Sequence, residues 1–513
     1  METTVINNRF EVLRKLGEGG FGCVYLVRDQ ATNEVCALKL IRPQLAARRD
    51  IQDSFRKEAI IWMEFGRHPN IVNVRAVDHF NGSLFVALEF IPPNEFGACT
   101  LDKQIRNGKP SLRNALKWAL DICQGMTFAK SKGMIAHRDL KPSNLMIDAS
   151  STIKVTDFGL ASFLVDSTAQ HVDTAPSGTP PYMPPEQFVA EAKVDERSDI
   201  YSFGIVLYEI LSGGQFPFKM EKTDPRNYFS YFYQLHSTFV LPRFESPLYP
   251  IIAKCLAKSP QNRYASFAQA SADMQPLYRF SAGEDYRPMT PEDMKANEDI
   301  NYSASYFMLG DPTRALKHID RAVAKAPWLS IARNNKAAIL AQLGQIENAA
   351  AIWKELVHSF PKQGRPYYNL GLVAMQRGDL RNAMQLYQRA VELEPDYVPA
   401  TVNLAICFQQ AGDIEAALRL YDDAARLNPS DAQIRYNKGF LLFQIDKLEE
   451  ARAIFEEVIA LNPNHVSAHN YLGLCYHNLG QYEAALRCYN SALAIDPNYP
   501  HALKNRQALL NSR

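Results

Sequence analysis

The stretch Ala136-His137-Arg138-Asp139-Leu140-Lys141-Pro142-Ser143-Asn144 decides the fold of this chain, because other short motifs accompany it in a fixed order. The accompanying motifs are Val35-Cys-Ala-Leu-Lys39 upstream, then Thr156-Asp-Phe-Gly159 and Gly178-Thr-Pro-Pro-Tyr-Met-Pro-Pro-Glu186 downstream. An amphipathic stretch over 53–65 presents Glu58 nineteen residues beyond Lys39. One such motif is weak evidence, whereas several independent motifs in one order exclude a chance match.

Residues 10–27 read as a glycine-rich turn between two strand-like segments. The glycines at 17, 19 and 22 let the main chain close over a polyphosphate without Cβ clashes. A dinucleotide-binding fold uses the same glycine pattern but needs a helix directly after it. Here the residues 23–27, Cys-Val-Tyr-Leu-Val, are β-branched and aromatic and predict a strand. The sequence therefore favours a β-hairpin that covers phosphates.

Taken together, the motifs resemble those of eukaryotic-type Ser/Thr protein kinases over residues 10–277. The resemblance implies an α+β fold of two lobes, and transfer of the ATP γ-phosphoryl group to Ser or Thr hydroxyls of protein substrates. A lysine at position 141 marks the Ser/Thr class rather than the Tyr class. The segment 178–182 resembles a polypeptide acceptor site, which disfavours a kinase of small molecules.

The resemblance also implies a role for individual residues, in line with the positioning and charge stabilisation that phosphoryl transfer requires. The expected catalytic residues are Asp139, Lys141, Lys39 and Glu58. The expected ATP-binding residues are Gly17, Gly19, Gly22, Val24, Ala37, Lys39, Glu89 and Ile91. The expected ligands of Mg²⁺, with Mn²⁺ as an alternative, are Asn144 and Asp157. Asp139 would accept the proton of the substrate hydroxyl or orient that hydroxyl, and Glu58 would orient Lys39.

Further residues are expected to support this site by the same resemblance. Thr179 would contact the catalytic aspartate and the acceptor, and His137 would serve as scaffold beneath the loop. Asp199 would brace the catalytic loop from a buried helix. Glu186 and Arg263 would form an ion pair that anchors the activation segment.

Two points stay open on the sequence alone. The kinase fold is either active or a weak or inactive scaffold, in which case the repeats described below act as a protein-interaction adaptor. The lysine, the catalytic aspartate and the metal-binding residues that inactive kinases usually lose are all present, which favours activity. The hydroxyls of Ser167, Thr168, Thr174 and Ser177 are candidates for regulatory phosphorylation, and a plain solvated loop is the alternative.

The C-terminal half repeats every 34 residues. Proline recurs at 327, 361, 395, 429, 463 and 497, and alanine at 315, 349, 383, 417, 451 and 485. A bulky residue follows each alanine by four positions, and a small residue precedes each by twelve. Glycine separates the two helical segments in five repeats, at 310, 344, 378, 412 and 480, and Asp446 is the exception. A fixed period of this length predicts a stacked array of helix pairs.

These columns resemble the tetratricopeptide repeat and imply an all-α solenoid of six repeats over 296–499, with a capping helix at 500–513 and a linker at 278–295. By resemblance the first helices line a concave face, where we expect a peptide or protein ligand. Asn335, Asn369, Asn403 and Asn437 recur on these helices. One hypothesis is that they hold the main chain of an extended peptide, but bonding between neighbouring repeats is the favoured interpretation, since an Asn inside a helix often serves packing.

The composition excludes several other classes of protein. Among 513 residues, 56 Lys and Arg balance 55 Asp and Glu, so no net charge favours nucleic acid as a partner. No run approaches the roughly 20 apolar residues of a membrane span. The eight cysteines show no CxxC pair, and the N-terminus does not resemble a signal peptide. We therefore expect a cytoplasmic location.

Overall fold

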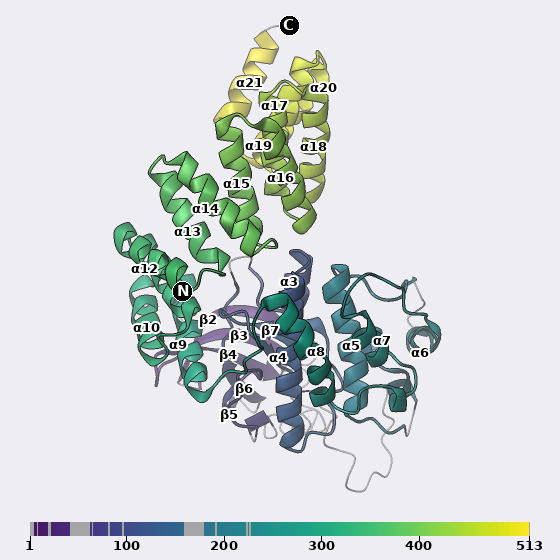
Figure 1. Ribbon diagram of the computed structural model, residues 1–513. Coiled ribbons are helices and arrows are strands. Elements are labelled where there is room, and N and C mark those ends of the chain that lie inside the picture. Colours follow the sequence, from purple (N-terminus) through teal and green to yellow (C-terminus); the bar gives the residue numbers. More distant parts are fainter. Residues whose placement is uncertain are drawn as a thin grey trace. The chain divides into compact units, whose positions relative to one another are not determined.

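The computed structural model describes residues 5–7, 9–18, 22–41, 62–63, 65–80, 83–94, 97–158, 179–189, 192–221, 224 and 227–511. These residues form a lobe built on a β-sheet, a helical lobe and a long run of paired helices (Figure 1). They group into two compact units, with the boundary after Leu343 and with residues 106–109 in the second unit. This architecture confirms the predicted two-lobed α+β fold followed by an all-α array.

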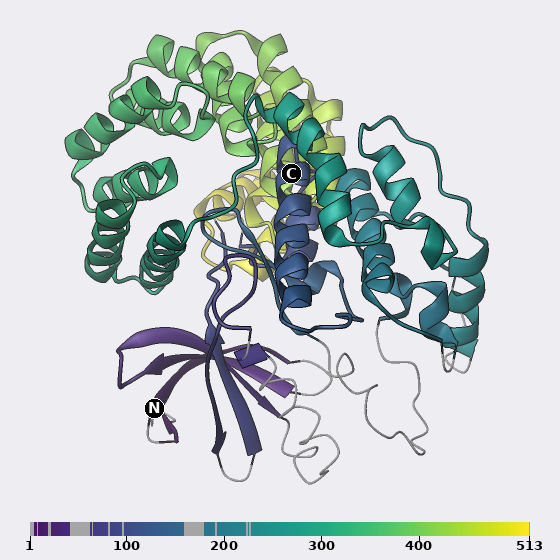
Figure 2. The same ribbon diagram turned by 60° about the horizontal axis from the view of Figure 1, so that its bottom comes forward.

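Six antiparallel strands form one sheet in the order β1-β2-β3-β4-β6-β5, shown in purple and blue in Figure 2. Their bounds are β1 Val5–Ile6, β2 Phe10–Glu18, β3 Gly22–Asp29, β4 Glu34–Ile41, β5 Val74–Phe80 and β6 Ser83–Glu89. Successive side chains of a strand point to opposite faces. Leu26 and Leu88 therefore join the core shared with the helical lobe, whereas Val27 and Phe85 pack in a second cluster on the other face. Strand β3, directly after the glycines, confirms the predicted hairpin.

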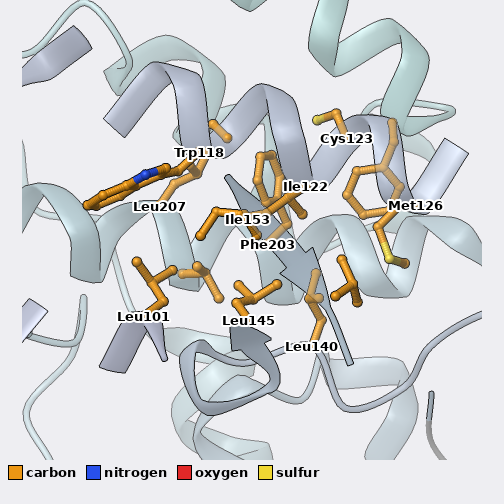
Figure 3. Packing of buried hydrophobic residues seen from close by; sticks show 14 of the residues in the cluster. Leu101, Trp118, Ile122, Cys123, Met126, Leu140, Leu145, Ile153, Phe203 and Leu207 are labelled. Atoms are coloured by element: carbon orange, nitrogen blue, oxygen red, sulfur yellow. The ribbon is translucent and has the colours of Figure 1, made fainter. Parts of the chain in front are cut away.

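The helical lobe contains α3 Leu101–Arg106, α4 Leu112–Ser131, α5 Glu196–Ser212, α6 Tyr228–Thr238, α7 Tyr249–Cys255 and α8 Phe267–Ala282. A short hairpin, β7 Leu145–Ile147 and β8 Ile153–Val155, lies against α4. Figure 3 shows Trp118 and Ile122 of α4 packing with Phe203 of α5 and with Leu140 and Leu145. This packing fixes both ends of the segment that connects α4 to β7.

Helix α5 is buried along most of its length and anchors the lobe. It begins where the side chain of Asp195 accepts a hydrogen bond from Arg197 N, and it ends at Gly213 in the left-handed conformation. At Gly204 it approaches α7 closely, since a Cβ there would lie 2.8 Å from Cβ of Cys255. A larger residue would force the two helices apart.

The repeats form twelve helices in pairs, followed by a last helix. The first unit holds α9 Pro291–Met308, α10 Pro312–Lys325 and α11 Ser330–Gln342. The second unit holds α12 Ile346–Ser359, α13 Gly364–Gln376, α14 Leu380–Leu393, α15 Val398–Ala411, α16 Ile414–Leu427, α17 Ala432–Gln444, α18 Leu448–Leu461, α19 Val466–Asn478, α20 Tyr482–Ile495 and α21 Pro500–Asn511. Between α8 and α9 the connection is residues 283–290, and the exact domain boundaries stay a prediction.

The columns seen in the sequence explain how each helix pair packs. All six alanines of the column that starts at Ala315 are fully buried. The small column accommodates the bulky one: a Cβ at Gly371 would lie 2.6 Å from Cε1 of Tyr387. The five turn glycines have φ between 75° and 85°, and Asp446 adopts the same left-handed conformation at 62°. The left-handed turn conformation therefore recurs in all six repeats, including the one in which aspartate replaces glycine.

We also looked for segments that could lie in a lipid bilayer. Among the described residues, no helix is both long and apolar enough to cross a membrane.

Candidate active site

The segment between α4 and β7 gathers three of the predicted site residues. Asn144 Nδ2 donates to the main-chain oxygen of Asp139 at 2.9 Å and to its Oδ2 at 3.1 Å. Lys141 Nζ lies 2.8 Å from the same Oδ2. Arg138, just before the aspartate, has φ of 67°, a conformation that is uncommon for a residue with a Cβ. Asp139, Lys141 and Asn144 thus form one polar cluster.

Thr179 joins this cluster from the segment that precedes α5. Its Oγ1 donates to Asp139 Oδ1 at 2.7 Å and accepts a hydrogen bond from Lys141 Nζ at 2.6 Å. The hydroxyl therefore lies between a carboxylate that can take its proton and an ammonium that can stabilise negative charge. The site at Asp139 accommodates an alcohol.

Lys39 of β4 reaches the aspartate of the second motif. Its Nζ lies 2.6 Å from Oδ1 of Asp157. Burial by itself would raise the pKa of Asp157, but the ammonium of Lys39 outweighs burial and holds that pKa below its usual value of 3.8. The carboxylate is therefore ionised at neutral pH, as a cation ligand must be.

Phe158 and Asp157 have opposite environments. The ring of Phe158 is buried, with its centroid 5.0 Å from Phe65, 5.8 Å from Trp62 and 5.0 Å from His137. The side chain of Asp157 is 41% exposed. The aromatic contacts therefore hold the motif with its ring in the core and its carboxylate open to a ligand.

His137 and Asp199 support the catalytic segment from below. Nδ1 of His137 accepts the N–H of Asp139 at 3.3 Å, so Nε2 carries the proton and donates to the main-chain oxygen of Thr156 at 3.1 Å. Burial lowers the pKa of His137, which keeps the ring neutral. Asp199 of α5 accepts the N–H groups of His137 at 2.6 Å and Arg138 at 2.8 Å, and burial raises its pKa to about 7.

A buried ion pair fixes the segment that follows Thr179. Arg263 NH1 and NH2 donate to the two carboxylate oxygens of Glu186 at 2.7 and 2.9 Å, and the Arg263 side chain is fully buried. Ser198 of α5 donates to Glu186 Oε1 at 2.7 Å. The bidentate geometry ties this segment to both α5 and the residues before α8.

His236 of α6 also holds the Thr179 segment, and the sequence analysis missed it. Its Nε2 donates to the main-chain oxygen of Pro180 at 2.9 Å, and its Nδ1 accepts from Tyr201 Oη at 3.0 Å. Burial lowers the pKa of His236 to about 4, so the neutral ring persists near neutral pH. No motif marks a histidine in the aromatic helix 228–238, so the sequence offers no signal for this contact.

The sheet face that the predicted ATP-binding residues share is set by strand register. Val24 pairs with Lys39 and Ala37 pairs with Leu88 across β3, β4 and β6, so these side chains lie on one face. Gly17 lies opposite Val24 on β2, and among the described residues other than its chain neighbours no atom lies within 4 Å of the place where its Cβ would be. Gly22 begins β3. This face of the sheet is therefore lined by small and apolar groups beside the ammonium of Lys39.

Glu89 and Ile91, at the end of β6 and just beyond it, are both buried. The Glu89 carboxylate lies 3.0 Å from Lys154 Nζ and accepts the N–H of Asn73 at 2.8 Å, while Glu89 N donates to Asn73 O. Burial opposes the charged form of Lys154, but Glu89 and Asp148 outweigh it and raise the Lys154 pKa. A hydrogen bond from adenine to Glu89 would thus use its main-chain oxygen.

Several predicted residues cannot be placed. Gly19, Glu58 and the four candidate phosphorylation sites Ser167, Thr168, Thr174 and Ser177 lie outside the described residues. Their roles stay predictions.

Comparison with known families agrees with this geometry. The family model described as "Protein kinase domain" matches residues 10–274, which is just over half of the chain. The chain belongs to the protein kinase family. Models described as "Tetratricopeptide repeat" match 304–363, 334–398, 374–438, 432–465 and 466–499. Both families predicted from the sequence are confirmed.

Individual relatives match through the kinase domain. The serine/threonine-protein kinase PknB of Mycobacterium leprae is 35% identical over 279 residues, which is 52% of this chain and 43% of that protein. The rice CBL-interacting protein kinase 5 is 32% identical over 212 residues, 41% of this chain and 44% of that protein. The chain thus spans less than half the length of these curated relatives. The crystal structure of the Mycobacterium tuberculosis PknI kinase domain covers 55% of this chain and 100% of its own, with 22% identity and a TM-score of 0.41.

Proposed function

We propose that this protein is a Ser/Thr protein kinase that transfers the γ-phosphoryl group of ATP to Ser or Thr hydroxyls of proteins. The observation that carries the proposal is the hydroxyl of Thr179, held between Asp139 and Lys141. A site that binds one alcohol in this way has the charges that a substrate alcohol needs. The kinase relatives whose names include Ser/Thr specificity support the same class.

The described residues divide the chemistry among them. Asp139 orients the substrate hydroxyl and accepts its proton as the oxygen attacks phosphorus. Lys141 stabilises negative charge on the phosphoryl group during transfer. Lys39 holds the phosphates that remain with the nucleotide, and it is already drawn toward the site by Asp157.

Mg²⁺ fits the donor set at this site. The ionised carboxylate of Asp157 is a ligand that Mg²⁺ prefers, and Asn144 can add its amide oxygen because its nitrogen bonds Asp139. The other ligands of such an ion would be phosphate oxygens and water. Bound there, the ion would neutralise phosphate charge; Mn²⁺ is the alternative.

We also propose that the repeats bind a peptide or protein, either a substrate or a regulator. Asn301 stands one 34-residue step before Asn335, and its Oδ1 accepts the main-chain N–H of Ala149 at 3.2 Å. That contact supports the view that this column binds main-chain groups. At Asn403 the side chain instead donates to Tyr368 Oη at 3.3 Å, which favours bonding between neighbouring repeats at that position.

An inactive scaffold is less well supported, because Lys39, Asp139, Asn144 and Asp157 are all present and in contact with one another in pairs. For location we propose the cytoplasm. All eight cysteines are free thiols, which suits a reducing compartment.

The test is transfer of labelled phosphate from ATP and Mg²⁺ to the protein itself and to a generic basic protein. Asp157→Ala should reduce incorporation by about 100-fold or more, because it removes the charged ligand of the metal. Asp285→Ala, at an exposed aspartate of the 283–290 connection, is the matched control and should stay active. Nucleotide binding without any incorporation by the unmodified protein would contradict the proposal and favour the scaffold.

A further inference from the structure

Helix α9 buries polar side chains that the first helix of a solenoid would normally expose to water. Asn297 and Asn301 are 3% and 6% exposed. Buried amides require hydrogen-bond partners. Their partners lie in the kinase domain, which belongs to the same compact unit as α9. Helix α9 therefore packs as part of the unit that contains the kinase domain, although its sequence belongs to the repeats.

One end of this contact holds the turn between β7 and β8 in the helical lobe. Asn297 Nδ2 donates to Asp148 Oδ2 at 2.6 Å, and its Oδ1 accepts from Ser150 Oγ at 2.5 Å. Asn301 accepts the N–H of Ala149, whose side chain packs against the apolar cluster of α9 and α10. Strand β7 begins directly after Asn144, and strand β8 ends two residues before Asp157. The turn between the two strands is therefore linked at both ends to residues of the active site.

The other end holds the sheet lobe. Tyr302 Oη donates to Glu34 Oε2 at 2.6 Å, and Arg75 both donates to Tyr302 Oη and stacks with its guanidinium 4.9 Å from the ring centroid. Tyr306 Oη donates to the main-chain oxygen of Asn33 at 2.5 Å. Glu34 begins β4, the strand that carries Lys39.

Between Asn297 and Tyr302, further residues of α9 also contact the kinase domain. Glu298 forms an ion pair with Arg67 at 2.9 Å. A small cavity is lined by Glu89 and Lys154 from the kinase domain, and by Asn297, Glu298 and Asn301 from α9. Along this one helix, Asn297 and Asn301 therefore contact the helical lobe, and Tyr302 and Tyr306 contact the sheet lobe.

We propose that α9 is a strap that fixes the separation of the two kinase lobes and so positions Lys39 relative to Asp157. The proposal rests on the kinase function proposed above and names the part of the repeats that acts on it. From Asn297 to Tyr306 the helix spans about 14 Å, and a helix of this length is stiff compared with the hinge of a two-lobed enzyme. A strap works only when both ends are attached.

The need for attachment at both ends distinguishes a strap from contacts that only stabilise the fold, and this difference can be measured. In the full chain, a first single-end variant, Asn297→Ala with Asn301→Ala, removes the side-chain hydrogen bonds of the helical-lobe end. A second single-end variant, Tyr302→Phe with Tyr306→Phe, removes those of the sheet-lobe end, and the double variant combines the two. The readout is the Kd of a non-hydrolysable ATP analogue with Mg²⁺, with the melting temperature recorded alongside. Each single variant should raise Kd by about 3- to 10-fold, because open states compete with the binding-competent one. The double variant should show the same rise as either single variant.

Independent contacts would instead give a double variant whose rise is the product of the two single rises. That result, or an unchanged Kd in both single variants, would overturn the proposal. Lys295→Ala, an exposed position of α9, is the matched control and should leave Kd unchanged. If a variant fails to fold, Asn297→Ala and Tyr302→Phe alone repeat the cycle with milder changes. The readout of this experiment is nucleotide affinity. A protein that binds the ATP analogue but transfers no phosphate would therefore contradict the proposed kinase function and leave the strap proposal unaffected.

Discussion

The ammonium of Lys39 lies 2.6 Å from a carboxylate oxygen of Asp157, which follows 118 residues later in the chain. Lys39 belongs to β4 of the sheet lobe, and Asp157 lies two residues beyond the end of β8 in the helical lobe. This ion pair therefore joins the lobes at the place where phosphate and cation would bind.

Removal of the Lys39 ammonium should impair catalysis without preventing the protein from folding. Lys39→Met should lower kcat/KM for ATP by about 100-fold, because a charged contact to phosphate is lost in a partly buried site. The pKa of Asp157 should rise at the same time, since Lys39 is what lowers it. Steady-state kinetics with Lys130→Met, an exposed lysine at the end of α4, as control would check this. Equal rates for both variants would contradict the role of Lys39.

The hydroxyl of Thr179 should matter for the acceptor and not for the nucleotide. Thr179→Val removes the group that Asp139 and Lys141 share, and kcat on a protein substrate should fall about 10- to 100-fold while nucleotide affinity stays the same. Thr179→Ser keeps the hydroxyl and should retain most activity. If the valine and serine variants are equally active, the hydroxyl has no part in the reaction.

The ion pair between Glu186 and Arg263 should be important for stability. Arg263→Met leaves Glu186 buried without its partner, and the free energy of unfolding should fall by about 3 to 5 kcal/mol. Arg279→Met breaks a pair whose two side chains are 70% and 71% exposed, and should cost about 1 kcal/mol or less. Thermal unfolding of the two variants side by side gives the comparison. Similar losses in both would mean that the buried pair is not special.

The carboxylate of Asp299 should make the first helix pair sensitive to acid. Burial would raise its pKa, but bonds from His318 at 3.0 Å and Lys325 at 2.6 Å outweigh burial and hold the pKa below 3.8. A lowered carboxyl pKa stabilises the fold above the unfolded value and stops doing so as pH falls through the folded value. Asp299→Asn should therefore be less stable by about 1 to 3 kcal/mol at pH 7.

The difference between the Asp299→Asn variant and the unmodified protein should narrow as the pH falls through the lowered pKa of the native carboxylate, which lies below 3.8. Melting temperatures measured from pH 7 down into the acid range below that pKa would show this narrowing. A gap that stays constant over the whole range would place the effect of the substitution in packing rather than in charge.

The sequence predicts most of what depends on local motifs and periods. Asp139, Lys141 and Asn144 lie within nine residues of one another, and a turn of that length brings them together wherever the fold forms. The 34-residue columns work in the same way, because each repeat contacts mainly its neighbours. Even Asp446 keeps the turn conformation, since the flanking helices fix the backbone there.

The sequence alone did not predict these contacts between distant segments. Nothing in the aromatic helix that carries His236 indicates that it would bind the main-chain oxygen of Pro180. Asn297 breaks no repeat column, and its partner Asp148 is 149 residues away. Such pairs depend on how whole elements pack, and polar residue types recur too often along the chain to identify them one by one.

The central claim is that the site around Asp139 transfers phosphate to a Ser or Thr hydroxyl. The most direct measurement is single-turnover transfer from ATP with Mg²⁺ to a protein acceptor, with the modified residues identified by mass spectrometry. We expect phosphate on Ser or Thr, and a rate that falls by about 100-fold or more in Asp139→Asn, where the proton acceptor is lost. An unchanged rate in Asp139→Asn, or phosphate found only on Tyr, would contradict it.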